Sequence, residues 1–252
     1  MPIEGNSGTW DEFEQYVTNF LAGSPYYPYA SEWMPAISAG WDKVEFEKNY
    51  REYVISTQIK IGPKDNATLL KARPLEKLCH YFLKQGGIVT DIKEISEPQK
   101  WQVDGQGPLN KTAIRLCFGE KICQEVGFQL YMEAKNHSSA ATNEEFSSHF
   151  RRMEEHDCYL GVFVSTSGYR MQRGKGIAQS IHRNYWGKRF HLLLTFQSMQ
   201  KVALNRMAPL AVLQEALCYA VNDMYVNDKD VQRNYSQEAC SQAAKTEYAR
   251  LT

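Results

Sequence analysis

The sequence lacks several features that mark common classes of protein. No apolar run approaches the ~20 residues needed to span a bilayer, and the N-terminus, MPIEGNSGTW, has neither the basic start nor the apolar stretch of a secretory signal. We therefore expect a cytoplasmic protein without membrane association. The six cysteines form no CxxC pair and have no regular spacing, so neither a zinc module nor a disulfide framework is indicated. Reduced and mostly buried thiols are expected.

Three well-known catalytic motifs are also missing. The segment SGYRMQRGKG follows an apolar strand pattern, as a phosphate-binding loop would. However, five residues separate Gly168 from Gly174 where that loop has four, and Gly176 stands where Ser or Thr would hold magnesium. Nothing resembles a serine nucleophile elbow or a zinc-protease helix. The sequence therefore predicts none of these three chemistries.

The chain has no net charge, but its charges are unevenly distributed. Residues 1–50 hold eight acidic and only two basic residues. Residues 168–189 hold no acid and six bases, which are Arg170, Arg173, Lys175, Lys188, Arg183 and Arg189. A basic segment of this kind can follow the phosphates of a nucleic acid, although on its own it is more often a solvated charged surface.

Composition, together with a polar segment around Pro63, predicts one main domain with appendages. With 43% hydrophobic and 23% charged residues, 252 residues can bury a sizeable core. We assign residues 1–62 to an acidic, aromatic-rich N-terminal appendage, 63–228 to the main domain, and 229–252 to a C-terminal helix. Within the appendage, a capping box predicts a helix over 10–22, whereas 45–57 fits either a helix or a helix turning into a strand.

Strand and helix patterns alternate through the main domain. Helices are predicted from Pro74 to Gly86, after the capping box Thr142-x-x-Glu145, and from Pro209 to about residue 226. Strands are predicted over 88–92, 101–104, 111–118, 126–135, 159–166 and 190–196. The last two are continuously apolar, which is typical of strands covered on both faces. This alternation favours a layered α/β fold.

The stretch VGFQLYMEAKNH, residues 126–137, carries the strongest candidate for a site. A two-residue period directs Phe128, Leu130, Met132 and Ala134 to the core, and Gln129, Tyr131, Glu133 and Lys135 to the opposite face. A carboxylate beside an ammonium group at a strand end often marks a place where a cation or a phosphate binds. An acid-x-Lys triplet is expected by chance about twice in such a chain, and Asp91-Ile92-Lys93 is a rival.

Two further acids stand at informative positions. Glu76 lies in the first turn of the helix after Pro74, where the helix dipole alone would favour an acid. Asp104 ends the strand predicted over 101–104, where an aspartate is also an ordinary turn residue.

In this order of elements, the chain resembles the restriction-endonuclease-like superfamily of PD-(D/E)xK nucleases, especially Mrr-like and related defence nucleases. The resemblance covers about residues 66–200 and rests on LEKL at 75–78, VDG at 103–105, MEAKNH at 132–137 and GVFVSTSGYR at 161–170. The chain departs from the pattern in having no proline before Asp104 and 28 residues between Asp104 and Glu133. Asp91 is therefore kept as an alternative first acid.

The resemblance implies a mixed central sheet flanked by helices and a set of roles for these residues. Asp104, Glu133 and the carbonyl of Ala134 would hold Mg²⁺, or Mn²⁺ as its substitute. Lys135 would orient the attacking water, and Glu76 would help a second metal or act as a base. Arg170, Arg173, Lys175 and Arg183 would bind the nucleic acid backbone.

Two functions follow from these expectations. The first is a Mg²⁺-dependent endonuclease, of DNA or alternatively RNA, in restriction or anti-phage defence. The second is a non-catalytic nucleic-acid-binding or assembly subunit of the same fold. A homodimer, or a defence-complex partner bound through the N-terminal region, is compatible with either function.

Overall fold

A five-stranded mixed sheet forms the centre of the molecule. The computed structural model describes residues 42–62, 66, 68–96, 102–170, 189–205, 207–221 and 224–252. The strands follow one another in the order β1 (Lys93–Ser96), β2 (Gln102–Pro108), β3 (Gln129–Lys135), β4 (Leu160–Ser165) and β5 (Phe190–Thr195). The pairs β1–β2 and β2–β3 are antiparallel, whereas β3–β4 and β4–β5 are parallel.

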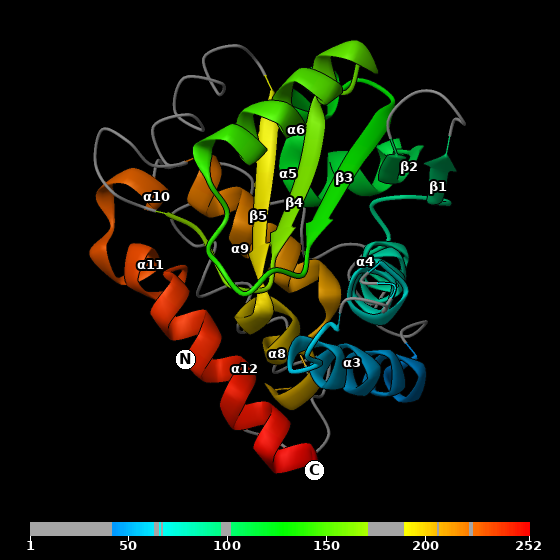
Figure 1. Cartoon of the computed structure of the whole chain (residues 1–252). Coiled ribbons are helices and arrows are strands. Elements are labelled where there is room, and N and C mark those ends of the chain that lie inside the picture. The colour runs from blue at the N-terminus through cyan, green and yellow to red at the C-terminus, as the bar shows by residue number, and fades with distance from the viewer. Residues whose placement is uncertain are drawn as a thin grey trace.

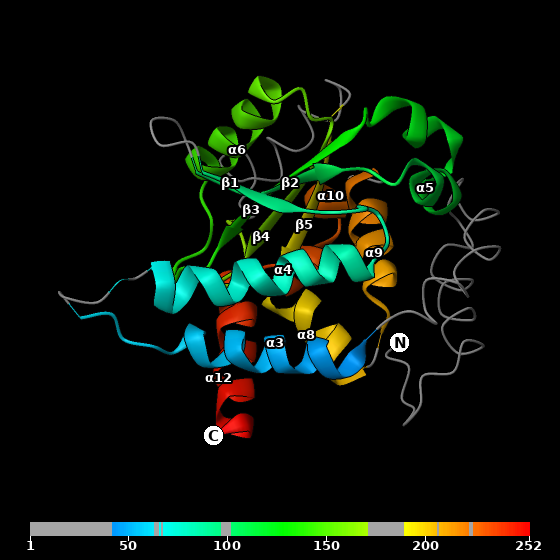
Figure 2. The same ribbon diagram turned by 90° about the vertical axis from the view of Figure 1, so that its right-hand side faces the viewer.

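Helices cover both faces of this sheet. On one face lies α6 (Asn143–Glu155), and on the other lie α4 (Arg73–Gln85) and α9 (Pro209–Val221) (Figures 1 and 2). Outside α4 runs α3 (Lys43–Thr57). The remaining described helices are a π-helical turn (Thr68–Ala72), α5 (Lys111–Glu125), α8 (Phe196–Asn205), α10 (Met224–Asn227), α11 (Lys229–Asn234) and α12 (Gln237–Leu251). The predicted α/β layering is confirmed.

The main core lies between the sheet and the layer of α3 and α4. The apolar stripe of α4, which consists of Leu75, Leu78, Cys79 and Phe82, is buried in this core. Residues 43–57, for which the sequence left two alternatives, form a helix whose Phe46, Tyr50 and Tyr53 join the same core. The Tyr53 hydroxyl donates to Thr166 Oγ1 at 2.8 Å, which ties α3 to the loop after β4.

Local sequence signals explain most helix boundaries. At the start of α6, Thr142 and Glu145 make the predicted reciprocal capping box. Pro74 stands in the first turn of α4, and Pro209 begins α9. All six residues of β4 and all six of β5 are buried, as expected for strands covered on both faces.

Three predicted strands differ from the structure. Residues 111–118 begin helix α5, because Asn110 Oδ1 caps the Ala113 amide at 3.1 Å and the helix buries Ile114, Phe118 and Ile122 at four-residue spacing. In 88–92 only Val89 makes a bridge, to Leu109, and β1 begins later. Strand β2 does not end at Asp104 but runs on to Pro108.

Two side chains within residues 126–137 also differ from the prediction. Phe128 is 77% exposed because β3 begins one residue after it. The two-residue period places Tyr131 on the face opposite the core, yet Tyr131 is fully buried because α6 covers that face. Its ring lies 5.2 Å from that of His149. The face that carries Glu133 is therefore an interior face.

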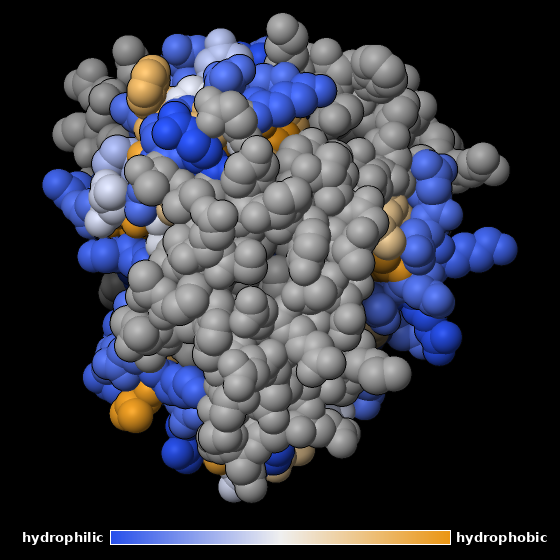
Figure 3. All heavy atoms as spheres, turned by 180° about the vertical axis from the view of Figure 1, so that it is seen from behind, coloured by the Kyte–Doolittle hydropathy of each residue, from blue (hydrophilic) through white to orange (hydrophobic). Residues whose placement is uncertain are grey.

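Other predictions fall partly or wholly outside the described residues. These are the helix over 10–22, the first residue of the strand predicted over 101–104, and the part of the basic segment that contains Arg173, Lys175 and Arg183. Among the described helices, none combines the length and apolar character needed to cross a bilayer. The described cysteines are free, and four of the five are buried. Seen from behind, the described surface is mainly hydrophilic with scattered apolar side chains (Figure 3).

Candidate functional site

Two acids that are distant in the chain meet where β2 runs alongside β3. The antiparallel register pairs Gly105 with Met132, so the next residues along the two strands are Asp104 and Glu133. Residues that oppose each other in this way point to the same face of a sheet. The Asp104 carboxylate accepts a hydrogen bond from the Ala134 amide at 2.8 Å, which fixes it against β3.

Glu133 and Lys135 form a close ion pair on the same face. Lys135 Nζ lies 2.7 Å from Glu133 Oε1. The Glu133 side chain is only 4% exposed, whereas that of Lys135 is 26% exposed. The carboxylate is thus buried beneath a cation that reaches solvent, and the ion pair offsets part of the cost of burying it.

Helix α6 adds two residues that sequence reasoning missed. His149 Nδ1 lies 3.6 Å from Glu133 Oε2, and Arg152 Nη1 lies 3.7 Å from Glu133 Oε1. His149 is fully buried beside Phe146 and Phe163. A signal was present, because His149 interrupts the apolar stripe of a helix whose start the capping box fixes. The sequence did not show that this stripe faces Glu133.

Glu76 approaches the same cluster from α4. It is 4% exposed, and Arg73 Nη1 lies 3.7 Å from its Oε2. The pKa of Glu76 is raised to about 7, mainly by burial and also by the charges of Asp104 and Glu94, while Arg73 and Lys135 act in the opposite direction. The structure therefore brings together Asp104, Glu133 and Lys135, three of the four predicted site residues. The fourth, Glu76, lies close enough to feel the charges of Asp104 and Lys135.

The three carboxyl groups differ in their affinity for protons. Burial raises the pKa of Asp104, the Ala134 hydrogen bond lowers it, and the neighbouring Glu133 raises it again, with a net upward shift. Burial would also raise the pKa of Glu133, but the contact with His149 and the charge of Lys135 lower it to about 2. Glu133 is thus firmly ionised, whereas Glu76 and Asp104 hold protons more readily than usual.

The donor atoms of this cluster suit a hard cation. Glu76 Oε2 and Glu133 Oε2 are buried and have no hydrogen-bond partner among the described residues. Within those residues there is no group of three or more His, Cys, Asp or Glu side chains that could hold a metal ion. Mg²⁺, however, binds through one or two carboxylates and completes its shell with waters and phosphate oxygens. Asp104 and Glu133 fit such a partial protein shell.

The rival first acid lies elsewhere. Asp91 is 47% exposed, and its carboxylate faces Lys84 and Lys93 at 3.7 and 3.6 Å. The amide of Ile92 donates to it and, with the two lysines, lowers its pKa. Asp104, and not Asp91, is the aspartate that meets Glu133.

The basic segment is described only at its two ends. Arg170 is exposed after β4, and its amide donates to Ala141 O at 3.2 Å. Arg189 has a structural contact, because its guanidinium lies 3.5 Å from Glu154 and stacks over Tyr159. Arg173, Lys175 and Arg183 lie outside the described residues, so their predicted contacts with nucleic acid stay predictions.

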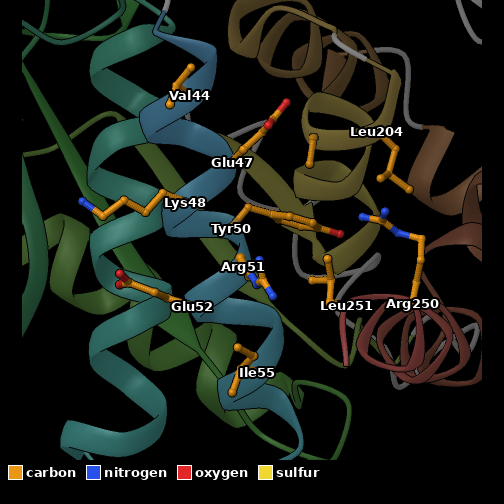
Figure 4. A pocket seen from close by; sticks show the side chains of 11 residues that line it. Val44, Glu47, Lys48, Tyr50, Arg51, Glu52, Ile55, Leu204, Arg250 and Leu251 are labelled. Carbon is orange, nitrogen blue, oxygen red and sulfur yellow. The ribbon is translucent and has the colours of Figure 1, made fainter.

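Two surface hollows lie apart from this cluster. One of about 810 Å³ opens between α3, α8 and α12 and is lined by apolar and charged side chains, including Val44, Lys48 and Arg250 (Figure 4). Another of about 570 Å³ is lined mainly by polar residues from the loops after β3 and β4 and from α12. Neither is lined by any of the four nominated side chains.

Comparisons with protein-family models, with curated proteins and with solved structures give no match to this chain.

Proposed function

We propose that this protein is a Mg²⁺-dependent endonuclease of the restriction-endonuclease-like type that hydrolyses phosphodiester bonds, with DNA as the favoured substrate. The observation that carries the proposal is the meeting of Asp104 and Glu133 across β2 and β3, with Lys135 Nζ 2.7 Å from Glu133. Asp104, Glu133 and the Ala134 carbonyl would hold the ion, which supplies charge neutralisation and an activated water when bound.

Asp104, Lys135 and Glu76 would then have separate roles in catalysis. Asp104 is held in place by the Ala134 amide, so a ligand oxygen is oriented before the ion arrives. Lys135 reaches solvent and would orient the attacking water and offset negative charge in the transition state. Glu76, whose pKa burial raises to about 7, can take or give a proton near neutral pH, as a general base must.

The partners of this activity follow from charge and symmetry. Arg170, Arg173, Lys175 and Arg183 would bind the sugar–phosphate backbone without reading sequence. RNA is the alternative substrate. A homodimer would place two sites for cutting both strands, and the acidic residues 1–62 would bind a partner within a defence complex. Restriction or anti-phage defence in the cytoplasm is the cellular role we propose.

The direct test incubates the full-length protein with plasmid, linear DNA and RNA, in Mg²⁺, in Mn²⁺ and in EDTA. We expect DNA cleavage with either metal and none with EDTA. Glu133→Ala should abolish cleavage while circular dichroism shows a folded protein. Cleavage by folded Glu133→Ala at the wild-type rate would refute the proposal.

A second candidate is a nucleic-acid-binding or assembly subunit without catalysis. It is favoured by the ion pairing of Glu133, whose carboxylate lies near both Lys135 and Arg152, so that its charge is balanced by the protein alone. This alternative predicts salt-sensitive DNA binding and no cleavage by the wild-type protein in any metal. It also predicts that Glu133→Ala leaves the affinity for DNA unchanged.

A further inference from the structure

In the candidate site, two basic side chains lie nearer to solvent than two of the acidic side chains. Lys135 and Arg152 are 26% and 20% exposed, whereas the Glu133 and Glu76 side chains are only 4% and 5% exposed. A molecule that approaches from solvent therefore meets an ammonium and a guanidinium group before it meets the carboxylates of Glu133 and Glu76. Such an outer layer attracts an anion, while the buried acids below attract a cation.

Arg152 reaches Glu133 from α6. Its Nη1 lies 3.7 Å from Glu133 Oε1, and its charge interacts with Asp104 and Tyr131 as well. The same Glu133 oxygen contacts Lys135 Nζ at 2.7 Å, so the two cations converge on one carboxylate oxygen from α6 and from β3.

A close contact between α6 and β4 keeps Arg152 in this position. A Cβ added at Gly161 would lie 2.3 Å from Met153 Sδ and 2.8 Å from His149 Nε2. Gly161 is paired in the sheet with Tyr131, two residues before Glu133. The missing side chain thus lets α6 approach the sheet at the turn that carries Arg152.

We propose that Arg152 is a catalytic residue of this site, whose guanidinium binds two non-bridging oxygens of the scissile phosphate beside Lys135. The planar fork of arginine matches a phosphate in a bidentate way that a lysine cannot reproduce. A divalent ion on Asp104 and Glu133 would repel the guanidinium, and a phosphate between the two positive groups relieves that repulsion. This inference rests on the proposed function, because the phosphate is that of the endonuclease substrate.

The chain offers a matched control for Arg152. Arg151 is its neighbour on α6, but its side chain is 62% exposed and its Nε lies 3.9 Å from Glu155, one turn further along the helix. Arg151→Gln removes the same charge from the same helix without touching the cluster.

The test compares Arg152→Gln, Arg152→Lys and Arg151→Gln with the wild type in two assays. The first measures binding of a short DNA duplex in EDTA as a function of salt, and the second measures single-turnover cleavage in Mg²⁺. Arg152→Gln should lower the cleavage rate by about 10²–10³-fold and reduce the salt slope of binding by about one phosphate contact. Arg152→Lys should keep the salt slope but lose most of the cleavage rate, and Arg151→Gln should match the wild type.

Two results would overturn the inference. One is that the Arg152→Gln variant binds DNA with the same salt slope, and cleaves it at the same rate, as the Arg151→Gln variant. The other, which decides the matter if Arg152→Gln does not fold, is a folded Arg152→Lys with the wild-type cleavage rate. Failure of the wild type to cleave refutes the proposed function instead, and the binding assay in EDTA then decides whether Arg152 contacts phosphate.

Discussion

At the scale of single residues, Glu133 is the side chain around which β2, β3 and α6 meet. Its two carboxylate oxygens face Lys135 on its own strand and His149 and Arg152 on α6, and its backbone neighbour Ala134 holds Asp104. A two-residue period in the sequence was enough to nominate Glu133 and Lys135. It could not show which aspartate meets them, because that depends on the register between β2 and β3.

The choice between the two aspartates can be tested by metal binding. Asp104→Asn should weaken Mn²⁺ binding about 10–100-fold, because a neutral amide replaces one of two anionic ligands. Asp91→Asn should leave it unchanged, since Asp91 faces Lys84 and Lys93 instead. Titration of Mn²⁺ followed by calorimetry measures both. Equal affinities for the two variants would remove Asp104 from the site.

Glu76 should leave a signature in the pH dependence of stability. Burial raises its pKa from 4.5 to about 7 in the folded protein. Between these values the folded state binds more protons than the unfolded state, so the Glu76 contribution to stability falls as the pH rises through this window. Glu76→Gln cannot ionise, and its stability relative to wild type should therefore rise from about pH 5 to about pH 8, by on the order of 1–3 kcal/mol.

Urea unfolding in EDTA at both ends of this window gives the free energies of unfolding. Glu52→Gln is the control, because Glu52 is exposed and pairs with Lys77 on the surface. A Glu76→Gln protein whose stability relative to wild type is the same at both pH values would show that Glu76 ionises normally.

At the scale of elements, motifs with a defined cap could be predicted and short apolar runs could not. The capping box fixed the start of α6, and continuous apolar runs identified β4 and β5. Residues 111–118 have alternating apolar residues that suit a strand, but the same residues also recur at four-residue spacing. The Asn110 cap decides in favour of a helix, and no property of 111–118 alone reveals it.

The approach of α6 to β4 can be tested at Gly161. Gly161→Ala places a methyl group where Met153 Sδ would be 2.3 Å away, so α6 must shift or Met153 must repack. We expect a loss of roughly 1–3 kcal/mol in the free energy of unfolding. Cleavage should fall as well, because α6 carries His149 and Arg152. Ser147→Ala, at an exposed position of α6, is the control.

An unchanged melting temperature for Gly161→Ala would mean that α6 does not need this close contact. Unchanged cleavage in a destabilised Gly161→Ala protein would mean that the position of α6 matters only for stability.

At the scale of the whole molecule, the cluster lies towards the end of β3, the strand that joins the antiparallel and parallel halves of the sheet. Strands β3 and β4 run parallel and end side by side, with Lys135 paired to Ser165. Ligands of α/β proteins commonly bind at such carboxyl ends, where loops gather around a rigid sheet. Much of the order of strands and helices could be predicted from sequence, although residues 111–118 form a helix in place of the predicted strand. The meeting of β2, β3 and α6 at Glu133 could not be predicted, because it depends on long-range packing.

In the proposed function, Asp104 and Glu133 bind a divalent ion beside Lys135, and the site cleaves a phosphodiester bond. The most direct measurement is the rate of plasmid cleavage in Mg²⁺ by the wild type and by Lys135→Ala. Equal melting temperatures of the two proteins would show that both are folded to the same extent. We predict cleavage by the wild type and a rate at least about 10²-fold lower for Lys135→Ala. Equal rates for the two proteins, or wild-type cleavage that continues in EDTA, would contradict the account.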